Sequence, residues 1–330
     1  MILAEGSPAT GAHGEERGRN MANDDLRVAV LGPGGVGGLL AALLARTGLR
    51  VTCLAGDGTA RALRENGIRV RSGHYGPFTA RVEADTELRE PADIVIVAVK
   101  HTALDAALER VPAKKLDEDA LVVPLLNGVE HPAVLRERYG VGRLAPAVIR
   151  VESTRVAPGV IEHDSPFVEV DLTGETVARD RLDRLAGALE WAGVRVRVLD
   201  GEAAALWAKM AFLAPFALLT TRYGVPLGGV RTRYREELVA LVEETAAVAR
   251  ASGAAADPTA ALARYDALPA EMKSSMQRDA EADRPLELDA IGGALLRAAE
   301  RHEVAVPVAT RLVRELGWSF LDSWGPGRTV

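Results

Sequence analysis

The sequence contains only one cysteine, Cys53, in 330 residues. A single cysteine excludes an internal disulfide and is typical of proteins in a reducing compartment, so we expect a cytoplasmic location. Cys53 lies in an apolar, strand-like run, which predicts a buried thiol rather than a reactive one.

Clusters of basic residues are also missing. The formal net charge is −6, and no block of lysine or arginine stands out along the chain. This pattern favours neither a nucleic-acid surface nor an anionic membrane surface, so we predict no partner of either kind. An anionic ligand would have to be held by a few local groups.

Three catalytic chemistries lack their motifs. The six histidines do not show the paired spacing of metal ligands, and we predict no metal site. The sequence has no G-x-S-x-G nucleophile motif, and no Gly-Lys-Ser/Thr follows its glycine-rich loop. These absences argue against a hydrolase of the nucleophile-elbow type and against a P-loop protein.

The first residues, MILAEGSPATGAHGEERGRN, lack the apolar core of about seven or more residues that a secretory signal requires. We therefore predict that residues 1–25 form a disordered leader. Met21 is then an alternative start of translation.

What the sequence does have is a glycine-rich loop between an apolar run and a helix-like run. The stretch RVAVLGPGGVGG ends in three glycines, Gly32, Gly34 and Gly37, that fit G-x-G-x-x-G. In this motif the first glycine makes a tight turn, the second admits a pyrophosphate, and the third lets helix and strand pack closely. The phosphates then bind at the helix N-terminus. We predict cofactor binding by Gly32, Pro33, Gly34, Gly35, Val36 and Gly37, against a simple glycine-rich turn as the alternative.

Strand-like and helix-like runs alternate up to residue 200, which predicts an α/β fold of the Rossmann type with a mostly parallel sheet. The predicted strands are 28–31, 50–54, 94–99, 121–125, 143–150 and 194–198, with helices at 39–47, 59–66, 104–110 and 181–191. Two stretches, 68–82 and 159–172, are predicted to be antiparallel insertions. This dinucleotide-binding domain is expected to cover residues 26–200.

After residue 200 the pattern becomes helical almost without interruption. The predicted helices are 203–223, 235–252, 259–267, 270–278, 289–302 and 308–321. We therefore predict an all-α domain over residues 201–330.

Lys209 is the only charge in the run AAALWAKMAFLAPFALLTT. A membrane span is a poor interpretation, because a lysine and Pro215 interrupt the run, and a buried core helix fits better. Burial of an ammonium group is costly without a partner, so the lysine either extends its amine to the surface or lies in a functional cleft. The neighbouring nucleotide fold favours the cleft.

Four segments in this order carry a resemblance to a known family: VLGPGGVGG, VAVKHTAL, LLNGVEH, and LWAKM followed by SSMQRD and PLELD. From Leu26 to about Leu312, the chain resembles the ketopantoate reductase family. These NADPH-dependent enzymes reduce 2-dehydropantoate to pantoate on the coenzyme A pathway. The resemblance also implies a dimer through the helical domain.

The resemblance implies roles for five residues. Lys209 would be the general acid that protonates the carbonyl oxygen, and Glu287 would contact the substrate hydroxyl beside it. Ser275 would receive the substrate carboxylate, Asn127 would lie by the nicotinamide and the substrate, and Lys100 would line the cofactor side of the cleft. Without the resemblance, Asn127 is interpreted as part of an Asn-Gly turn and Lys100 as an exposed lysine after a strand. Ser275 and Glu287 are then interpreted as parts of a solvated loop.

Two departures from the family pattern concern the substrate. Asparagines commonly stand one and two turns after the catalytic lysine, and here those positions are Leu213 and Ala217. Without two amide partners the pocket becomes more apolar, so a bulkier 2-keto acid, or one without the hydroxyl, becomes an alternative substrate.

A third departure concerns the cofactor. NADPH-using members typically place an arginine after the second strand, where this chain has Gly56 followed by Asp57. An acid there favours the free ribose 2′-hydroxyl of NADH, whereas Arg61 could compensate for the missing arginine. We predict NADPH on family grounds and keep NADH as the alternative.

The sequence thus predicts an enzyme that transfers hydride from NADPH to ketopantoate, with Lys209 as the acid. The first alternative is a related oxidoreductase of another 2-keto or 3-hydroxy acid. The second is a nucleotide-sensing protein without turnover, against which the joint presence of Lys209, Ser275 and Glu287 argues.

Overall fold

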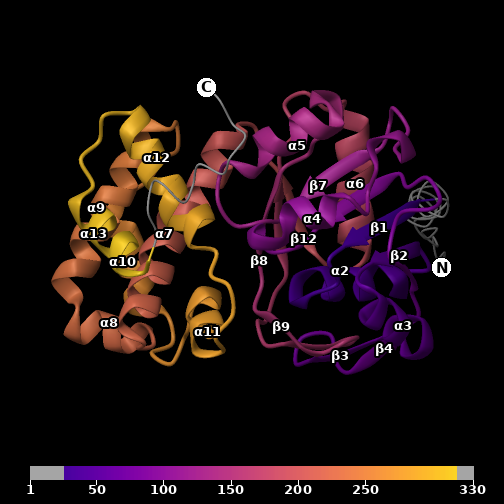
Figure 1. Ribbon diagram of the computed structural model, residues 1–330, viewed down its shortest axis with the longest axis horizontal. Helices are drawn as coiled ribbons and strands as arrows, with labels where there is room; N and C mark the ends of the chain where they lie inside the picture. Colours follow the sequence, from indigo (N-terminus) through magenta and orange to yellow (C-terminus); the bar gives the residue numbers. More distant parts are fainter. Residues whose placement is uncertain (1–25, 318–330) are drawn as a thin grey trace, which may run out of the picture.

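The computed structural model of the protein describes residues 26–317. An α/β part, with every described strand, lies beside a helical part that begins at residue 202 (Figure 1). The expected leader, residues 1–25, and the end of the last predicted helix lie outside the described residues. That the two parts are separate domains divided near residue 200 stays a prediction.

A five-stranded sheet in the order β5-β2-β1-β6-β7 forms the centre of the α/β part, and all its pairings are parallel. The chain adds β2 and β5 on one side of β1, and then β6 and β7 on the other side. The boundary between β1 and β6 is therefore the topological switch point, at which open α/β sheets bind ligands. The strands are β1 (Arg27–Leu31), β2 (Arg50–Leu54), β5 (Glu83–Asp85), β6 (Ile94–Val97) and β7 (Leu121–Pro124).

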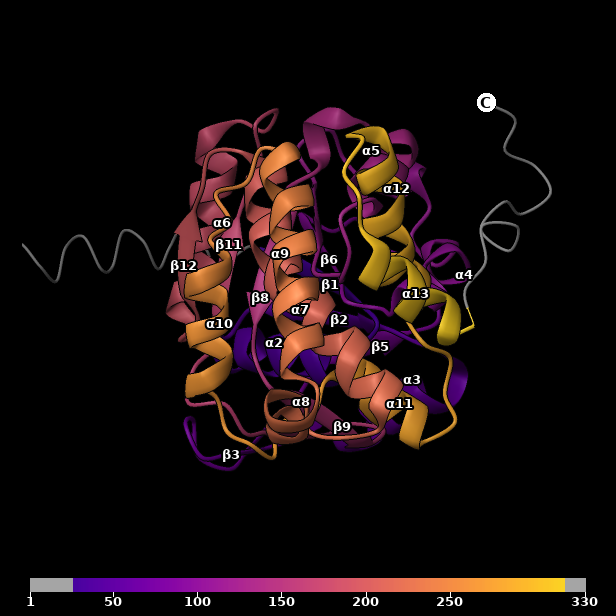
Figure 2. The ribbon, with the colours of Figure 1, turned by 90° about the vertical axis from the view of Figure 1, so that its left-hand side faces the viewer.

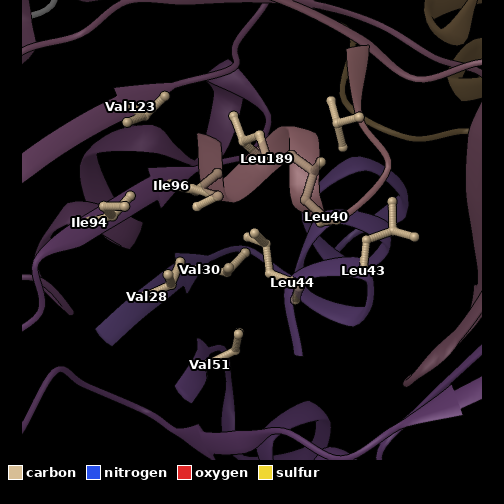
Figure 3. Packing of buried hydrophobic residues seen from close by; sticks show 14 of the residues in the cluster. Val28, Val30, Leu40, Leu43, Leu44, Val51, Ile94, Ile96, Val123 and Leu189 are labelled. Atoms are coloured by element: carbon tan, nitrogen blue, oxygen red, sulfur yellow. The ribbon is translucent and has the colours of Figure 1, made fainter. Parts of the chain in front are cut away.

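Helix α2 (Gly35–Arg46) covers one face of this sheet. Val28 and Val30 of β1 point toward Leu40 and Leu44 of the helix, and Leu189 of α6 (Arg179–Trp191) adds to the same core (Figure 3). The helix begins four residues before the predicted start at Leu39, because the last glycines of the loop already form its first turn. The remaining helices of this part are α3 (Asp57–Asn66), α4 (Leu104–Leu108) and α5 (His131–Tyr139), with 3₁₀ turns at His101–Ala103, Ala113–Lys115 and Val141–Arg143.

Two smaller sheets complete the α/β part. The strands β3 (Ile68–Ser72) and β4 (Phe78–Ala80) form the predicted antiparallel hairpin. The predicted antiparallel insertion at 159–172 is wrong in detail: β10 (Val160–His163) is parallel to β3, and β11 (Glu169–Leu172) belongs to another sheet. There β11 pairs antiparallel with β8 (Ala147–Arg150) and parallel with β12 (Arg195–Val198). These partners are distant in sequence, so local patterns do not show them. Strand β9 (Ser153–Ala157) pairs with β10.

The helical part is built around α7 (Glu202–Tyr223), seen at the centre of this part in Figure 2. Within the described residues it is the one helix long and apolar enough to cross a membrane, but 67% of its most apolar window is buried in the protein. Packing against the neighbouring helices therefore accounts for its composition. Those helices are α8 (Leu227–Arg233), α9 (Arg235–Ala251), α10 (Pro258–Ala267), α11 (Ser275–Glu281), α12 (Ala294–Arg301) and α13 (Pro307–Glu315).

One predicted helix is displaced. The helix expected at 270–278 is α11, which begins only at Ser275 because the Ser274 hydroxyl caps it by accepting a hydrogen bond from the Gln277 backbone N–H. Upstream of it the chain pairs with the start of α8, where the Leu227 N–H donates to the Met272 carbonyl. The helix expected at 289–302 opens with a π-helical turn, Asp289–Gly293, before α12.

Candidate functional site

The glycine loop follows β1 at the switch point, and a side chain would not fit at Gly32, at Gly37 or at Gly35, where a Cβ would lie 2.2 Å from the Ser153 carbonyl oxygen. Gly32 has φ +86°, and a Cβ there would lie 2.5 Å from Val99 Cγ1. A Cβ on Gly37 would lie 2.3 Å from the Gly32 carbonyl oxygen. The first glycine therefore makes the turn, and the third permits close contact of loop and helix, as the motif requires.

Gly34 differs from these glycines, because a Cβ there would find only the Gly32 carbonyl oxygen, at 4.0 Å. It precedes the first turn of α2, whose N–H groups have no helical acceptors. Open space beside free N–H groups at a helix start fits a pyrophosphate. The residues of this loop therefore fit a dinucleotide.

The loop after β2, where the adenosine ribose of a dinucleotide lies, contains Gly56 and Asp57, and both are exposed. Arg61 is exposed on α3, one turn further along. Arg110, which our sequence reasoning missed, donates from Nη1 to the Ala55 carbonyl at 3.2 Å and to the Thr86 carbonyl at 2.7 Å. Two cationic side chains therefore lie near this loop together with the acid.

Glu287 connects the helical part to the ends of two strands. Its carboxylate is buried and accepts from the His101 backbone N–H, at 2.9 Å, and from Asn127 Nδ2, at 3.1 Å. His101 follows β6 and Asn127 follows β7. The structure thus brings together two predicted site residues, Asn127 and Glu287, that are 160 positions apart.

Lys100 also contacts the helical part. Its Nζ lies 2.6 Å and 2.5 Å from the two carboxylate oxygens of Asp279 on α11. The Asp279 side chain is 4% exposed and also accepts from Arg284 Nε at 2.9 Å. A cofactor contact by Lys100, as the resemblance implies, would therefore have to coexist with this ion pair or replace it.

Lys209 lies on α7, where it is partly buried and forms no ion pair with a described residue. Burial lowers the pKa of its ammonium group to about 8, while the charge of Glu287 acts to raise it and that of Arg150 to lower it further. A lysine with this pKa holds its proton at neutral pH and gives it up readily, which suits a general acid.

Ser275 is exposed at the first position of α11, and no described hydrogen bond joins it to Lys209, Glu287 or Asn127. The adjacent Ser274 is buried and is committed to the helix cap and to Thr220. The positions of the missing asparagines are a partly buried Leu213 and a fully buried Ala217, both packed in the helical core. These two positions therefore offer no polar side chain to a ligand.

Sequence reasoning missed two further groups beside Lys209. His131, at the start of α5, is 1% exposed, and neither ring nitrogen has a hydrogen-bond partner in the described chain. Arg150, at the end of β8, has a buried Nη1 that also lacks a partner. The only local signal for His131 was its place in LLNGVEH, and for Arg150 there was none. Within residues 26–317, no group of three or more acidic, histidine or cysteine side chains could hold a metal ion.

Because His131 is buried without a hydrogen-bond partner in the described chain, we expect the stability of the protein to depend on pH. Burial, together with positive neighbours such as His101 and Lys209, lowers the pKa of His131 from 6.5 to about 3. Between these two pH values, His131 is therefore protonated in the unfolded state but not in the folded state. The free energy of unfolding consequently decreases as the pH falls from about 6.5 toward 3. Between pH 7 and 4.5 we expect His131→Gln to lose less unfolding free energy than the wild type, by about 2 kcal/mol.

Urea unfolding at the two pH values measures this difference. His302→Gln, at an exposed histidine, is the matched control and should retain the pH dependence of the wild type. An equal loss of stability in the wild type and in His131→Gln would contradict the prediction.

A glycine loop at the switch point of a parallel sheet, together with a partly buried lysine and a buried glutamate on a helical part, defines a two-part oxidoreductase of the Rossmann type. Matches to family models identify the family within this class. The family model described as "Ketopantoate reductase PanE/ApbA" matches residues 28–171, and the model of its C-terminal part matches residues 203–317. The chain belongs to the ketopantoate reductase family and is a 2-dehydropantoate 2-reductase-like oxidoreductase, and the family uses NADH or NADPH.

Similar proteins agree with this assignment. A 2-dehydropantoate 2-reductase of Mycobacterium tuberculosis is 32% identical over 91% of this chain and 99% of its own length. The crystal structure of the enzyme of that name from Geobacter metallireducens is 29% identical, with a TM-score of 0.81, over 88% of this chain and 99% of its own. A D-mandelate dehydrogenase, solved with NADH and anilino(oxo)acetate, shares the fold with a TM-score of 0.80 over 88% and 97% of the chains, at 19% identity.

Proposed function

We propose that this protein reduces 2-dehydropantoate to pantoate with NADPH, with Lys209 as the general acid. The observation that carries the proposal is the partly buried Lys209, whose pKa is lowered to about 8 and whose environment includes the Glu287 carboxylate. Few structural roles require an ammonium group in such a place, whereas proton transfer to a developing alkoxide does.

Each residue of the proposed site has a separate role in the reaction. The cofactor, when bound, supplies a hydride to the 2-carbon of the keto acid. Lys209 then gives its proton to the carbonyl oxygen, and Glu287 binds the hydroxyl side of the substrate. Glu287 itself is held in place by Asn127 and by the backbone of His101. Ser275 meets the substrate carboxylate from the exposed first position of α11.

The direct test is a panel of 2-keto acids, each assayed with NADPH and with NADH. 2-Dehydropantoate with NADPH should give the highest kcat/KM. The second candidate is a bulkier or hydroxyl-free 2-keto acid, or a 3-hydroxy acid, and it is favoured by the apolar side chains of Leu213 and Ala217. A higher kcat/KM for such a compound would replace the first proposal. Tight NADPH binding without turnover of any keto acid would instead indicate a sensing protein.

The choice between NADPH and NADH gives a separate prediction. Arg61 and Arg110 support NADPH, whereas Asp57 repels a 2′-phosphate. We expect Asp57→Asn to raise the ratio of kcat/KM for NADPH to that for NADH by about five- to tenfold, a small effect because the carboxylate is exposed and screened. Asp105→Asn, at the exposed start of α4, is the control and should leave the ratio unchanged. An unchanged ratio in Asp57→Asn would show that this acid does not face the ribose.

We further propose a cytoplasmic homodimer that forms through the helical part. The compartment is supported by the lone Cys53, whose thiol is buried with a pKa raised to about 12 by that burial. The dimer is supported by family resemblance, and sedimentation of the purified protein at micromolar concentration tests it.

A further inference from the structure

Arg150 is a charged group that acts on Lys209 and has no role in the proposed mechanism. It ends β8, and its charge acts on the pKa of Lys209. Three residues further along, the Ser153 hydroxyl donates to the Gly35 carbonyl of the glycine loop at 2.9 Å. Arg150 thus lies on a segment that contacts the glycine loop at Ser153 and whose charge acts on Lys209 at Arg150.

The same segment also reaches α11. Glu152 pairs with Arg278, which lies one turn after Ser275 on that helix. The end of β8 is therefore tied to the helix that presents the proposed carboxylate-binding serine. Arg150 is thus linked to the helix of Ser275 through Glu152 and Arg278, and to Lys209 through its charge.

The guanidinium of Arg150 is only partly used. Its Nη2 lies 2.7 Å from Asp171 Oδ2, while its Nη1 is buried without a partner in the described chain. A buried donor without an acceptor is costly, which calls for a reason such as a ligand. The side chain as a whole is 25% exposed, so a ligand can reach the guanidinium from solvent.

Asp171 does not need Arg150 for neutralisation. Arg197 already binds both of its carboxylate oxygens, with Nε at 2.7 Å and Nη2 at 2.9 Å. Two guanidinium groups thus share one carboxylate and leave one positive charge in excess. Of the other charged groups nearby, Glu287 acts on Lys209, Arg278 pairs with Glu152, and Arg195 pairs with Glu169. An excess positive charge with a free donor suits an anion.

We propose that Arg150 is a specificity-determining residue that binds the carboxylate of the 2-keto acid through Nη1. This inference rests on the proposed function and deepens it. Ser275 and Arg150 would donate to the two oxygens of the carboxylate, and the side chain of the acid would lie toward Leu213 and Ala217. The substrate class is then a 2-keto acid selected by its carboxylate and by an apolar remainder, with little dependence on amide donors.

The test compares Arg150→Gln with Arg197→Gln, because both changes remove one partner of Asp171 and only the first touches the proposed site. Calorimetric binding and kinetics are measured with the best 2-keto acid of the panel and with its neutral primary amide. Arg150→Gln should weaken binding of the acid by about ten- to a hundredfold, reduce the preference for acid over amide, and leave NADPH binding unchanged. Arg197→Gln should stay within about threefold of the wild type, because Arg197 is exposed and Arg150 still pairs with Asp171 in this variant.

A pH profile separates a ligand contact from a structural role. Arg150→Gln removes a positive charge near Lys209, so the pKa of the lysine rises and the basic limb of kcat moves to higher pH. Glu287, the other charged group that acts on this lysine, is unchanged in the variant. If Arg150→Gln does not fold, Arg150→Lys keeps the charge but loses the planar fork and should show a smaller loss of affinity in the same direction.

Two results would overturn the proposal: an unchanged preference for acid over amide in Arg150→Gln, or equal effects in Arg150→Gln and Arg197→Gln. A wild type that binds no 2-keto acid would overturn it as well, together with the proposed function. A wild type that reduces 2-keto acids while Arg150→Gln matches it would overturn this inference alone.

Discussion

Lys209→Ala is expected to lower kcat for reduction of the keto acid by at least about a hundredfold, because general-acid catalysis contributes that much or more. Cofactor binding should remain, since the glycine loop lies on the other part of the molecule. Single-turnover measurements with NADPH and the best acid of the panel separate the chemical step from binding. In the wild type, kcat should also fall above a pH of about 8, because the lysine must carry its proton.

Lys114→Ala is the matched control, since it removes an exposed lysine from a 3₁₀ turn far from these contacts. It should retain the wild-type rate and pH profile. A near-normal rate in Lys209→Ala, with the fold intact by circular dichroism, would end the assignment of this lysine as the acid.

Gly34→Ala is expected to weaken binding of NADPH and NADH by about ten- to a hundredfold, because its methyl group would occupy the space that the pyrophosphate needs. The protein without cofactor should lose less than about 1 kcal/mol of stability, because the added Cβ would have no neighbour closer than 4.0 Å. Cofactor titration by fluorescence measures the first effect, and urea unfolding measures the second.

Gly37→Ala gives the opposite result and serves as the comparison. Its Cβ would lie 2.3 Å from the Gly32 carbonyl oxygen, a backbone atom that cannot move away cheaply. We expect a loss of about 1–3 kcal/mol of stability even without cofactor. If Gly34→Ala bound cofactor like the wild type, or if both variants were equally unstable, the loop would not hold a pyrophosphate as we describe.

Local sequence patterns predicted much of the α/β part because they report neighbours along the chain. Four of the five parallel strands follow from short apolar runs, whereas β5, with the sequence EAD, was not predicted. The glycine loop follows from a motif whose members are at most five residues apart. The pairing of β11 with β8 and β12 could not be predicted this way, since any of several short strands satisfies the same pattern. The late start of α11 was missed because the cap depends on Ser274, which also bonds to Thr220 of a different helix.

The same distinction holds for the site, where one residue is conspicuous by its type in the sequence and others only by their surroundings in the fold. Lys209 was conspicuous because a single charge in an apolar run is rare, whereas Asn127, Ser275 and Glu287 entered only through the family resemblance. Arg150 had no signal and His131 only its place in LLNGVEH, because an arginine at a strand end and a histidine at a helix start are ordinary in any sequence. What makes them unusual is a ring and a guanidinium nitrogen that are buried without partners.

By itself, the sequence determined a Rossmann-type sheet followed by helices, a glycine loop for a dinucleotide, and a lysine in an apolar helix. The tertiary structure alone decided that Glu287 is held by Asn127 and His101, that Lys100 meets Asp279, and that Arg150 is left with a free donor beside Lys209. The physical reason is the range of each interaction. Helix, strand and turn preferences act between residues a few positions apart, whereas burial, charge and hydrogen-bond partners depend on which distant segments the folded chain brings into contact.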